Sequence, residues 1–177
     1  HPVDYTMMMC VGMDDPGLVV LPTHRLFRGV GPISSVELTD KLKSSFDCEV
    51  VGSGVELAND CWDAVQVEGV QSTMALYCRK DDTWVLARLR VEGVEVMGRL
   101  AEGRSECWQG LGVSILHELI LVHLLGYVEL AAPRYVHCID ELVKLLLVGD
   151  VDERDATGQQ GIEAFFELAC LVMPATI

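Results

Sequence analysis

The residues best suited to chemistry lie in one short segment, where Thr23, His24 and Arg25 are followed by Arg28. A hydroxyl, an imidazole and a guanidinium at one place can bind a phosphate or a carboxylate. Arg is the side chain best shaped for bidentate contact with either anion. The sequence therefore predicts a substrate-binding site for an anion at these four residues, in which His24 can orient or exchange a proton near neutral pH.

The same segment also has a structural interpretation. Residues 18–21 form an apolar run, and Pro22 cannot donate to a β-ladder, so we expect a strand that ends at Pro22. Thr23, His24 and Arg25 would then lie together at the mouth of that strand. In this interpretation Arg25 pairs with Asp14 or Asp15 across a hairpin and His24 caps the strand, and both interpretations stay open.

Histidines elsewhere invite a comparison with the His-Glu-x-x-His zinc helix, whose two histidines are four positions apart. Here His117 and Glu118 are followed by His123, so the histidines are six positions apart. On an α-helix that spacing separates them by roughly 120°. His137 and Asp140 are another pair, but nothing in the sequence places them near the first two. We expect a core or rim histidine at these positions and predict no metal site.

Other motifs of catalysis are incomplete. Residues 52–54, Gly-Ser-Gly, lack the third glycine and the Lys-Ser/Thr of phosphate loops, which indicates a tight turn. No Gly-x-Ser-x-Gly elbow of a serine hydrolase is present. A cysteine nucleophile would need an activating neighbour, and the acidic residues between 152 and 167 lack the order of a calcium loop, which indicates a solvated face. The sequence identifies no cofactor.

The elements that must position these residues follow from hydrophobic spacing, turn residues and helix caps. Ser34 and Ser35 offer N-caps for a helix, with Val36, Leu38, Leu42 and Phe46 as its buried positions. The order of elements predicts an α+β fold, a single domain whose mixed, largely antiparallel sheet packs against helices. The expected elements are hairpins 4–12/17–24 and 74–77/84–90, helices 34–47, 55–65, 111–125 and 140–147, strands 49–51, 135–137 and 169–173, an irregular polar segment 99–110 and a surface loop 150–160.

Composition restricts the partners. The chain has 177 residues, half of them apolar, which is enough for one core of its own. Its 27 acidic and 13 basic side chains give a formal charge of −14. That charge repels nucleic acid and anionic membrane surfaces, so we expect neither as a partner. A local cationic site for a small anionic molecule or a nucleotide remains possible, because salt screens each charge beyond about 10 Å.

Cysteine usage and hydropathy indicate the cellular compartment in which the protein is expected. Seven cysteines occur singly, without any Cys-x-x-Cys, which fits neither a disulfide framework nor a zinc ribbon. The start of the chain lacks the basic and apolar run of a signal peptide. Residues 115–125 are too few to span a bilayer, which needs about 20 apolar residues. These features predict a reducing, cytoplasmic location.

Three stretches resemble domain-of-unknown-function family 1015. Residues 13–25, Met-Asp-Asp-Pro-Gly-Leu-Val-Val-Leu-Pro-Thr-His-Arg, closely resemble a signature of that family. Trp108 with residues 111–119 is similar to its Leu-Asp-Val-Ser-x-Leu-His helix start, and residues 171–176 look like its later strand ending in Pro-Pro-Thr. Gly112 stands where the family usually has Asp, and Ala175 where it usually has Pro.

The resemblance carries implications for the whole protein. Members of that family have an upstream Asp-Gly-His-His-Arg segment, reminiscent of ParB and sulfiredoxin-like nucleotide-using domains, and a downstream Met-Pro-x-Lys-Ser-Thr tail. The resemblance implies that this chain is the C-terminal part of a larger protein, with that N-terminal domain as its partner. It also implies a nucleotide-using, phosphotransferase-like parent enzyme of small-molecule, amino-acid metabolism, to which this part contributes an anion-binding corner. The alternative is a non-catalytic structural, dimerisation or ligand-sensing domain, which includes a homo-oligomer.

Overall fold

The structure is a computed structural model that describes Cys10, Gly12, Asp15, Gly17 and residues 20–149 and 165–174. Most of the expected first strand, 4–12, of the N-terminal hairpin lies outside these residues. The expected loop 150–160 lies outside them entirely. The elements in chain order are β1 (His24–Phe27), α1 (Ser35–Leu42), β2 (Phe46–Ser53), η2 (Val55–Leu57), α2 (Ala58–Glu68), β3 (Thr73–Cys78), β4 (Thr83–Leu89), α3 (Val91–Leu100), α4 (Glu106–Gln109), α5 (Gly112–Ser114), η3 (Ile115–Leu124), β5 (Arg134–Val136), α6 (Ile139–Val148) and β6 (Leu168–Val172).

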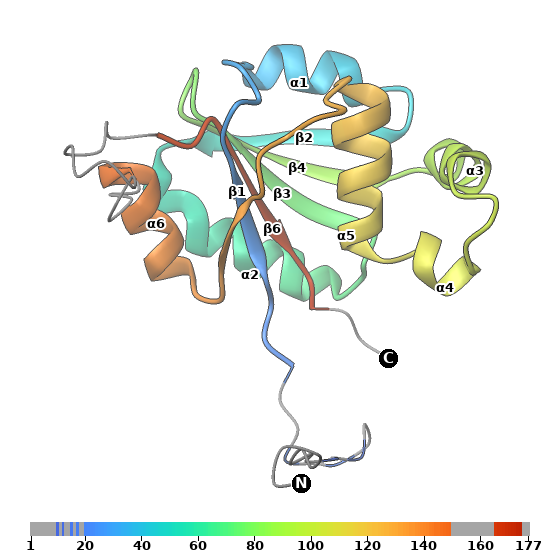
Figure 1. The fold of residues 1–177 in the computed structure, drawn as a ribbon. Helices are drawn as coiled ribbons and strands as arrows, with labels where there is room; N and C mark the ends of the chain where they lie inside the picture. Colours follow the sequence, from blue (N-terminus) through green and yellow to red (C-terminus); the bar gives the residue numbers. More distant parts are fainter. Residues whose placement is uncertain are drawn as a thin grey trace, which may run out of the picture.

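The strands form one six-stranded sheet with the order β2-β4-β3-β6-β1-β5 (Figure 1). Every pairing in it is antiparallel. The predicted α+β fold with a largely antiparallel sheet is therefore confirmed. The short strand β1 lies between β6 and β5, although both come more than 100 positions later in the chain.

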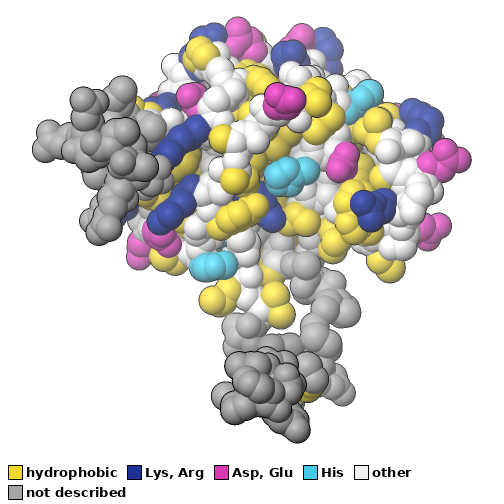
Figure 2. All heavy atoms as spheres, in the orientation of Figure 1, with side chains coloured by type: hydrophobic (Ala, Val, Ile, Leu, Met, Phe, Trp, Pro, Cys, Tyr) yellow, Lys and Arg dark blue, Asp and Glu magenta, His cyan; other side chains and the backbone are white. Residues whose placement is uncertain are grey.

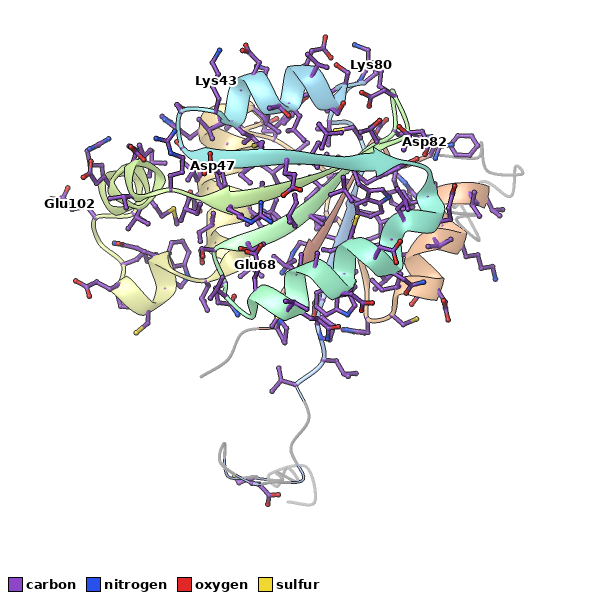
Figure 3. The ribbon with its side chains drawn as sticks, turned by 180° about the vertical axis from the view of Figure 1, so that it is seen from behind. Lys43, Asp47, Glu68, Lys80, Asp82 and Glu102 are labelled. Carbon is purple, nitrogen blue, oxygen red and sulfur yellow. The ribbon has the colours of Figure 1, made fainter. Side chains whose placement is uncertain are left out.

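Helices cover both faces of the sheet. On one face α1, α3 and η3 pack on residues such as Met74 and Leu76. On the other face α2 and α6 pack on the alternate residues, such as Ala75 and Tyr77. Seen from behind, α1 and α2 lie on either side of the edge strand β2 (Figure 3). The central strands β3 and β6 are buried throughout because both of their faces are covered.

The second hairpin is as the sequence predicts, because its signal is local. Strands β3 and β4 pair from Thr73 opposite Arg88 to Cys78 opposite Thr83. Asp82 in the turn adopts a positive φ of 50°, a conformation in which Asp is enriched among non-glycine residues. Both strands of this hairpin lie inside the sheet, between the edge strand β2 and strand β6.

Helix α1 begins where predicted and ends earlier. Ser34 Oγ accepts a hydrogen bond from the Glu37 backbone N–H, and the Glu37 carboxylate accepts one from the Ser34 backbone N–H, so the two residues form a capping box. Leu38 and Leu42 are buried as expected, whereas Val36 is exposed. Phe46 is buried in β2 and not in the helix, because it pairs with Leu89 of β4. The expected helical end near residue 47 is thus wrong, since pairing with the sheet overrides helical spacing.

Three other expectations need correction. Helix α3 was not predicted; it contains Gly93 and Gly98, and glycine disfavours a helix interior. The helix expected over 111–125 is present, but most of it, η3, has π-type hydrogen bonding. The strand expected to end at Pro22 instead begins at His24, where β5 and β6 supply hydrogen-bond partners. Pro22 lies before the ladder, where its missing N–H removes no ladder bond.

In the part of the chain that the structure describes, no helix has the length and hydrophobicity required to cross a membrane.

Candidate functional site

Strand β1 sends neighbouring side chains to opposite faces of the sheet, since successive residues of a strand alternate. Leu26 belongs to the core beneath α2 and α6, while Phe27 belongs to the core beneath η3. His24 therefore shares the α2 face, and Arg25 shares the η3 face. The structure separates the two residues that the sequence grouped as one binding corner.

His24 is buried against helix α2. Only 1% of its surface is exposed, and its ring meets the Trp62 ring edge-on with 4.7 Å between centroids. Neither ring nitrogen has a hydrogen-bond partner among the described residues. Burial, and then repulsion from His137 and Arg25, lowers the pKa of His24 to about 4. The imidazole is therefore neutral at physiological pH.

Arg25 is half-buried on the opposite face. Its Nη1 donates to the Thr23 carbonyl at 2.9 Å, and its guanidinium lies 5.4 Å from the centre of the Tyr135 ring on β5. Its Nε is buried and has no hydrogen-bond partner within the described part of the chain. Thr23 thus supports Arg25 through its carbonyl. This leaves part of a strong anion-binding group uncommitted.

The alternative pairing of Arg25 with the preceding turn receives no support from the described residues. Asp15 accepts a hydrogen bond from the Gly17 backbone at 2.8 Å. Asp14 lies outside the residues that the structure describes. Within them Arg25 forms no ion pair.

His117, on η3, joins the Arg25 face. Its ring approaches Phe27 edge-on, with 5.9 Å between centroids. Burial, and then repulsion by the Arg25 guanidinium, lowers the pKa of His117, while the Glu118 carboxylate opposes this. Arg25 and His117 are therefore close enough to interact electrostatically, and His117 is neutral near pH 7. We call Arg25, His117 and Tyr135 the Arg25 site.

A small cavity adjoins this site. It measures about 190 Å³, and Phe27, His117 and Tyr127 contribute to its walls together with residues 130–133. The segment between η3 and β5 crosses this face of the sheet (Figure 1). On the same face, histidine and basic side chains lie among hydrophobic ones (Figure 2). His117 thus has access to a space that could admit part of a ligand.

Arg28 lies apart from Arg25. Its guanidinium is 4.4 Å from the centre of the Phe166 ring, which belongs to the core beneath α2 and α6. Of the four residues predicted to bind substrate, Thr23 and Arg25 are in contact with each other. His24 contacts Trp62 of α2 and Arg28 contacts Phe166, so neither of them joins Arg25. The sequence analysis assigned His117 to the core or its rim and did not place it in the binding site; the available signal was its position in the second family-like stretch.

Cysteine chemistry is disfavoured beside Arg25. Cys170 on β6 stands opposite Arg25 in the sheet and is fully buried. Burial raises the pKa of Cys170 to about 12, although the Arg25 charge opposes this. Its thiol stays protonated and is a poor nucleophile. Burial likewise raises the pKa of Cys61 and of Cys78 to about 12.

The sequence predicts a tight turn at residues 52–54 and no metal site, and the described residues bear on both points. The Gly54 N–H donates to the Asp82 carbonyl at 2.8 Å, and the Gly54 carbonyl accepts from Trp84 Nε1 at 3.1 Å. Gly52 and Ser53, however, belong to strand β2, where they pair with Trp84 and Thr83 of β4. The expected turn over 52–54 is therefore wrong for these two residues, because pairing with β4 extends the strand, and only Gly54, with a φ of 113°, lies beyond it. No group of three or more His, Cys, Asp or Glu residues that could hold a metal occurs in the described ranges.

These observations define the class of protein: an antiparallel α+β domain with a half-buried arginine and a neutral histidine at one face of its sheet. Comparison with known families gives a match over residues 1–114, to the family described as "Protein of unknown function (DUF1015)". The chain belongs to this family, as its three family-like stretches predict. No curated protein and no solved structure matches the chain.

Proposed function

We propose that the Arg25 site binds a small anionic molecule or a nucleotide, as part of a nucleotide-using, phosphotransferase-like enzyme of small-molecule, amino-acid metabolism. One observation carries the proposal. A half-buried guanidinium with an uncommitted Nε lies beside a neutral imidazole and an adjoining cavity. A charged side chain and a histidine whose pKa is lowered, placed beside a hollow, are typical of functional sites.

The roles of the residues follow from their chemistry. Arg25 neutralises the charge of a phosphate or carboxylate and directs it through bidentate hydrogen bonds. His117 is neutral at pH 7, so it can accept a proton from a substrate hydroxyl or water. Tyr135 holds the guanidinium through a cation–π contact, and the Thr23 hydroxyl donates a further hydrogen bond. The proposal replaces His24 by His117 as the histidine of the site.

The surrounding charge favours a single, specific anion site. The net charge of −14 repels anions from the protein as a whole. Half-burial of Arg25 weakens salt screening of its charge, so the attraction operates at short range. Selective binding of a small anion is therefore compatible with an acidic protein that avoids nucleic acid.

The second candidate is a structural or dimerisation module without catalysis, and one observation favours it. Arg25 already makes a hydrogen bond to the Thr23 carbonyl and a cation–π contact with Tyr135. The contact with Tyr135 joins β1 to the edge strand β5. In this alternative Arg25 stabilises the edge of the sheet and binds no ligand.

The proposed location is the cytoplasm. All seven cysteines are free thiols, and three of them are buried. Free thiols on this scale are typical of a reducing compartment. Fractionation of cells that express the tagged full-length protein would test the proposal, and recovery in a secreted fraction would contradict it.

The decisive experiment measures the thermal stability of the protein with ADP, ATP, inorganic phosphate and phosphoserine. A ligand that binds the native state at 100 times its Kd adds about 2.7 kcal/mol. We expect at least one of these anions to raise the melting temperature of the wild type. Arg25→Gln should abolish that rise.

Arg134→Gln is the matched control, since Arg134 is exposed on β5 beside β1 and its loss removes the same charge. This variant should retain the stabilisation by the anion. If Arg25→Gln and Arg134→Gln lowered the stabilisation by the anion equally, the effect would come from the overall charge of the protein and not from a specific site. Absence of any shift in a well-folded wild type would favour the structural module.

A further inference from the structure

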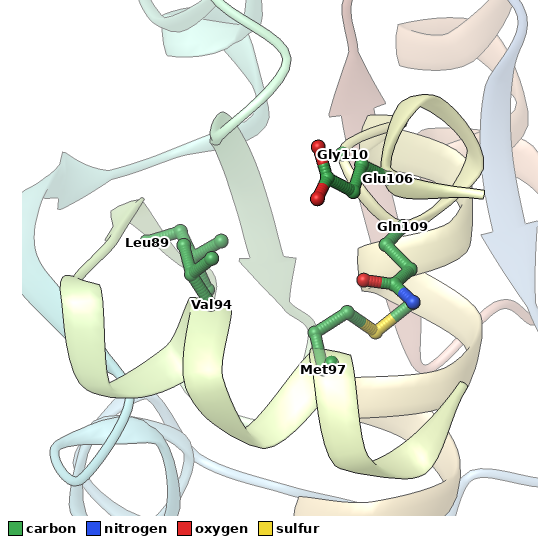
Figure 4. A pocket seen from close by; sticks show the side chains of 7 residues that line it. Leu89, Val94, Met97, Glu106, Gln109 and Gly110 are labelled. Carbon is green, nitrogen blue, oxygen red and sulfur yellow. The ribbon is translucent and has the colours of Figure 1, made fainter. Parts of the chain in front are cut away.

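A second pocket lies between helices α3 and α4, away from the Arg25 site. Its volume is about 360 Å³, within the range of small-molecule sites. It is lined by Leu89 at the end of β4, by residues of α3 and by residues of the α4 region (Figure 4). Met97 belongs to the core beneath η3 and is only 1% exposed, so one wall of the pocket is part of the packed core.

The walls combine an apolar surface with hydrogen-bond acceptors. Leu89, Val94 and Met97 supply the apolar part. The Glu106 carboxylate and the Gln109 carboxamide oxygen are turned into the space between the helices (Figure 4). The polar side-chain atoms at this pocket thus include a negative charge and a neutral acceptor.

The only side-chain donor among the lining residues is already used. Gln109 Nε2 donates to the Ala101 carbonyl at 2.9 Å and to the Arg104 carbonyl at 3.1 Å. These bonds orient the amide so that its oxygen is left for a ligand. The pocket therefore suits a ligand that brings donors and disfavours one that brings acceptors.

Glu106 has no ion pair among the described residues. Arg104, a nearby basic residue, instead lies 5.1 Å from the centre of the Trp108 ring. The carboxylate is therefore available to a cation from outside. The charge of −14 on the chain attracts such a cation and repels an anion.

We propose that this pocket binds a small organic cation, an amine with an apolar body, whose ammonium group contacts Glu106 and Gln109 while its apolar part lies on Leu89, Val94 and Met97. The pocket is separate from the Arg25 site and prefers the opposite charge. A charge-assisted hydrogen bond to Glu106 provides the selectivity.

Gly98 offers a way to fill the pocket without disturbing the backbone. A Cβ at this position would meet only the Gln109 Oε1, at 3.8 Å, which is ordinary contact. Gly98→Leu should therefore occupy the pocket with its own side chain. Gly98→Ala narrows the pocket and favours helix α3, so it provides a variant that folds even if the larger one does not.

The test uses 2-phenylethylamine as the probe and 3-phenylpropionate as its anionic counterpart, with the full-length protein. Binding is followed through the Met97 ε-methyl NMR signal. We expect the amine to shift that signal and the carboxylate to bind at least 10-fold more weakly. Glu106→Gln should weaken the amine about 10-fold, Gly98→Leu should abolish its binding, and Gly98→Ala should weaken it.

Glu95→Gln is the matched control for Glu106→Gln, because Glu95 is exposed on α3, which forms one wall of the pocket, but does not itself line the pocket. It should leave amine binding unchanged, as should Arg25→Gln. The proposal is overturned if the amine fails to shift the Met97 signal at millimolar concentration. It is equally overturned if the carboxylate binds as well as the amine, or if Glu106→Gln and Glu95→Gln behave alike.

Discussion

The two faces of the sheet at β1 treat adjacent polar residues in opposite ways. On the α2 face His24 is sealed against Trp62 with both nitrogens lacking partners, and its pKa falls to about 4. On the η3 face Arg25 keeps its charge, a partly exposed position and a histidine neighbour. Arg25 lowers the pKa of the imidazole on each face, His24 and His117, but of these two only His117 lines a described cavity. The difference shows that burial alone does not make a site.

The largest expected difference between the two faces comes from placing a carboxylate at position 24 and, separately, at position 25. His24→Asp would bury an unpaired charge, which we expect to destabilise the fold by about 4 kcal/mol. Arg25→Asp, on the half-exposed face, should change the free energy of unfolding by about 1 kcal/mol or less. Urea denaturation of both variants measures the difference, and comparable losses would show that the two faces are equally open.

The pH dependence of stability should come from the α2 face. The native pKa of His24 lies near 4, below the value of about 6.5 expected in the unfolded chain. The unfolded state therefore binds the proton first, and stability falls as the pH drops from 6.5 towards 4. The shift corresponds to about 3 kcal/mol of lost stability across that window.

His24→Phe keeps an aromatic ring beside Trp62 and removes the titrating group. Unfolding of this variant, measured between pH 4 and 7.5, should show a correspondingly flatter profile than the wild type. An unchanged profile would mean that other groups control the acid sensitivity.

A smaller effect is expected from the ring that seals His24. Trp62→Leu removes the edge-on contact, which is worth about 1 kcal/mol beyond the buried area. It should also expose the imidazole to water and thereby raise the pKa of His24 towards its ordinary value. NMR titration of the His24 ring protons measures that change, and a pKa that remains near 4 would assign the shift to the surrounding core.

The smallest effect on stability belongs to Arg25→Lys. This variant retains the charge but loses the contact of the guanidinium with Tyr135, so stability should change by about 0.5 kcal/mol or less. Anion binding should nevertheless fall about 10-fold, because an ammonium group cannot form the bidentate contact. Calorimetry with the anion identified for the wild type gives the affinity, and undiminished binding would show that charge suffices.

Local signals in the sequence predict much of the fold. The Ser34 and Glu37 capping box marks the start of α1, because both hydrogen bonds lie within four residues. The β3–β4 hairpin is equally local. Helix α6 and strand β6 also lie close to their predicted ranges. The family was likewise evident from short stretches of the chain.

The candidate site could be predicted only in part. Thr23 and Arg25 stand two positions apart, so their contact is a property of the chain itself. The approach of His117 to Phe27 depends on how η3 packs on the sheet, 90 residues later in the chain. The partnership of Arg25 and His117 therefore had no local signal, although each residue was visible in the sequence.

The sequence by itself determined the α+β class, the caps and turns, the family and the polar residues available for chemistry, since these depend on neighbouring residues. Only the tertiary structure decided which residues share a face. Strand β1 gains its position from pairing with β5 and β6, which are distant in sequence. That pairing fixes which side chains of β1 point to each face, so it separates His24 from Arg25 and brings Arg25 to His117.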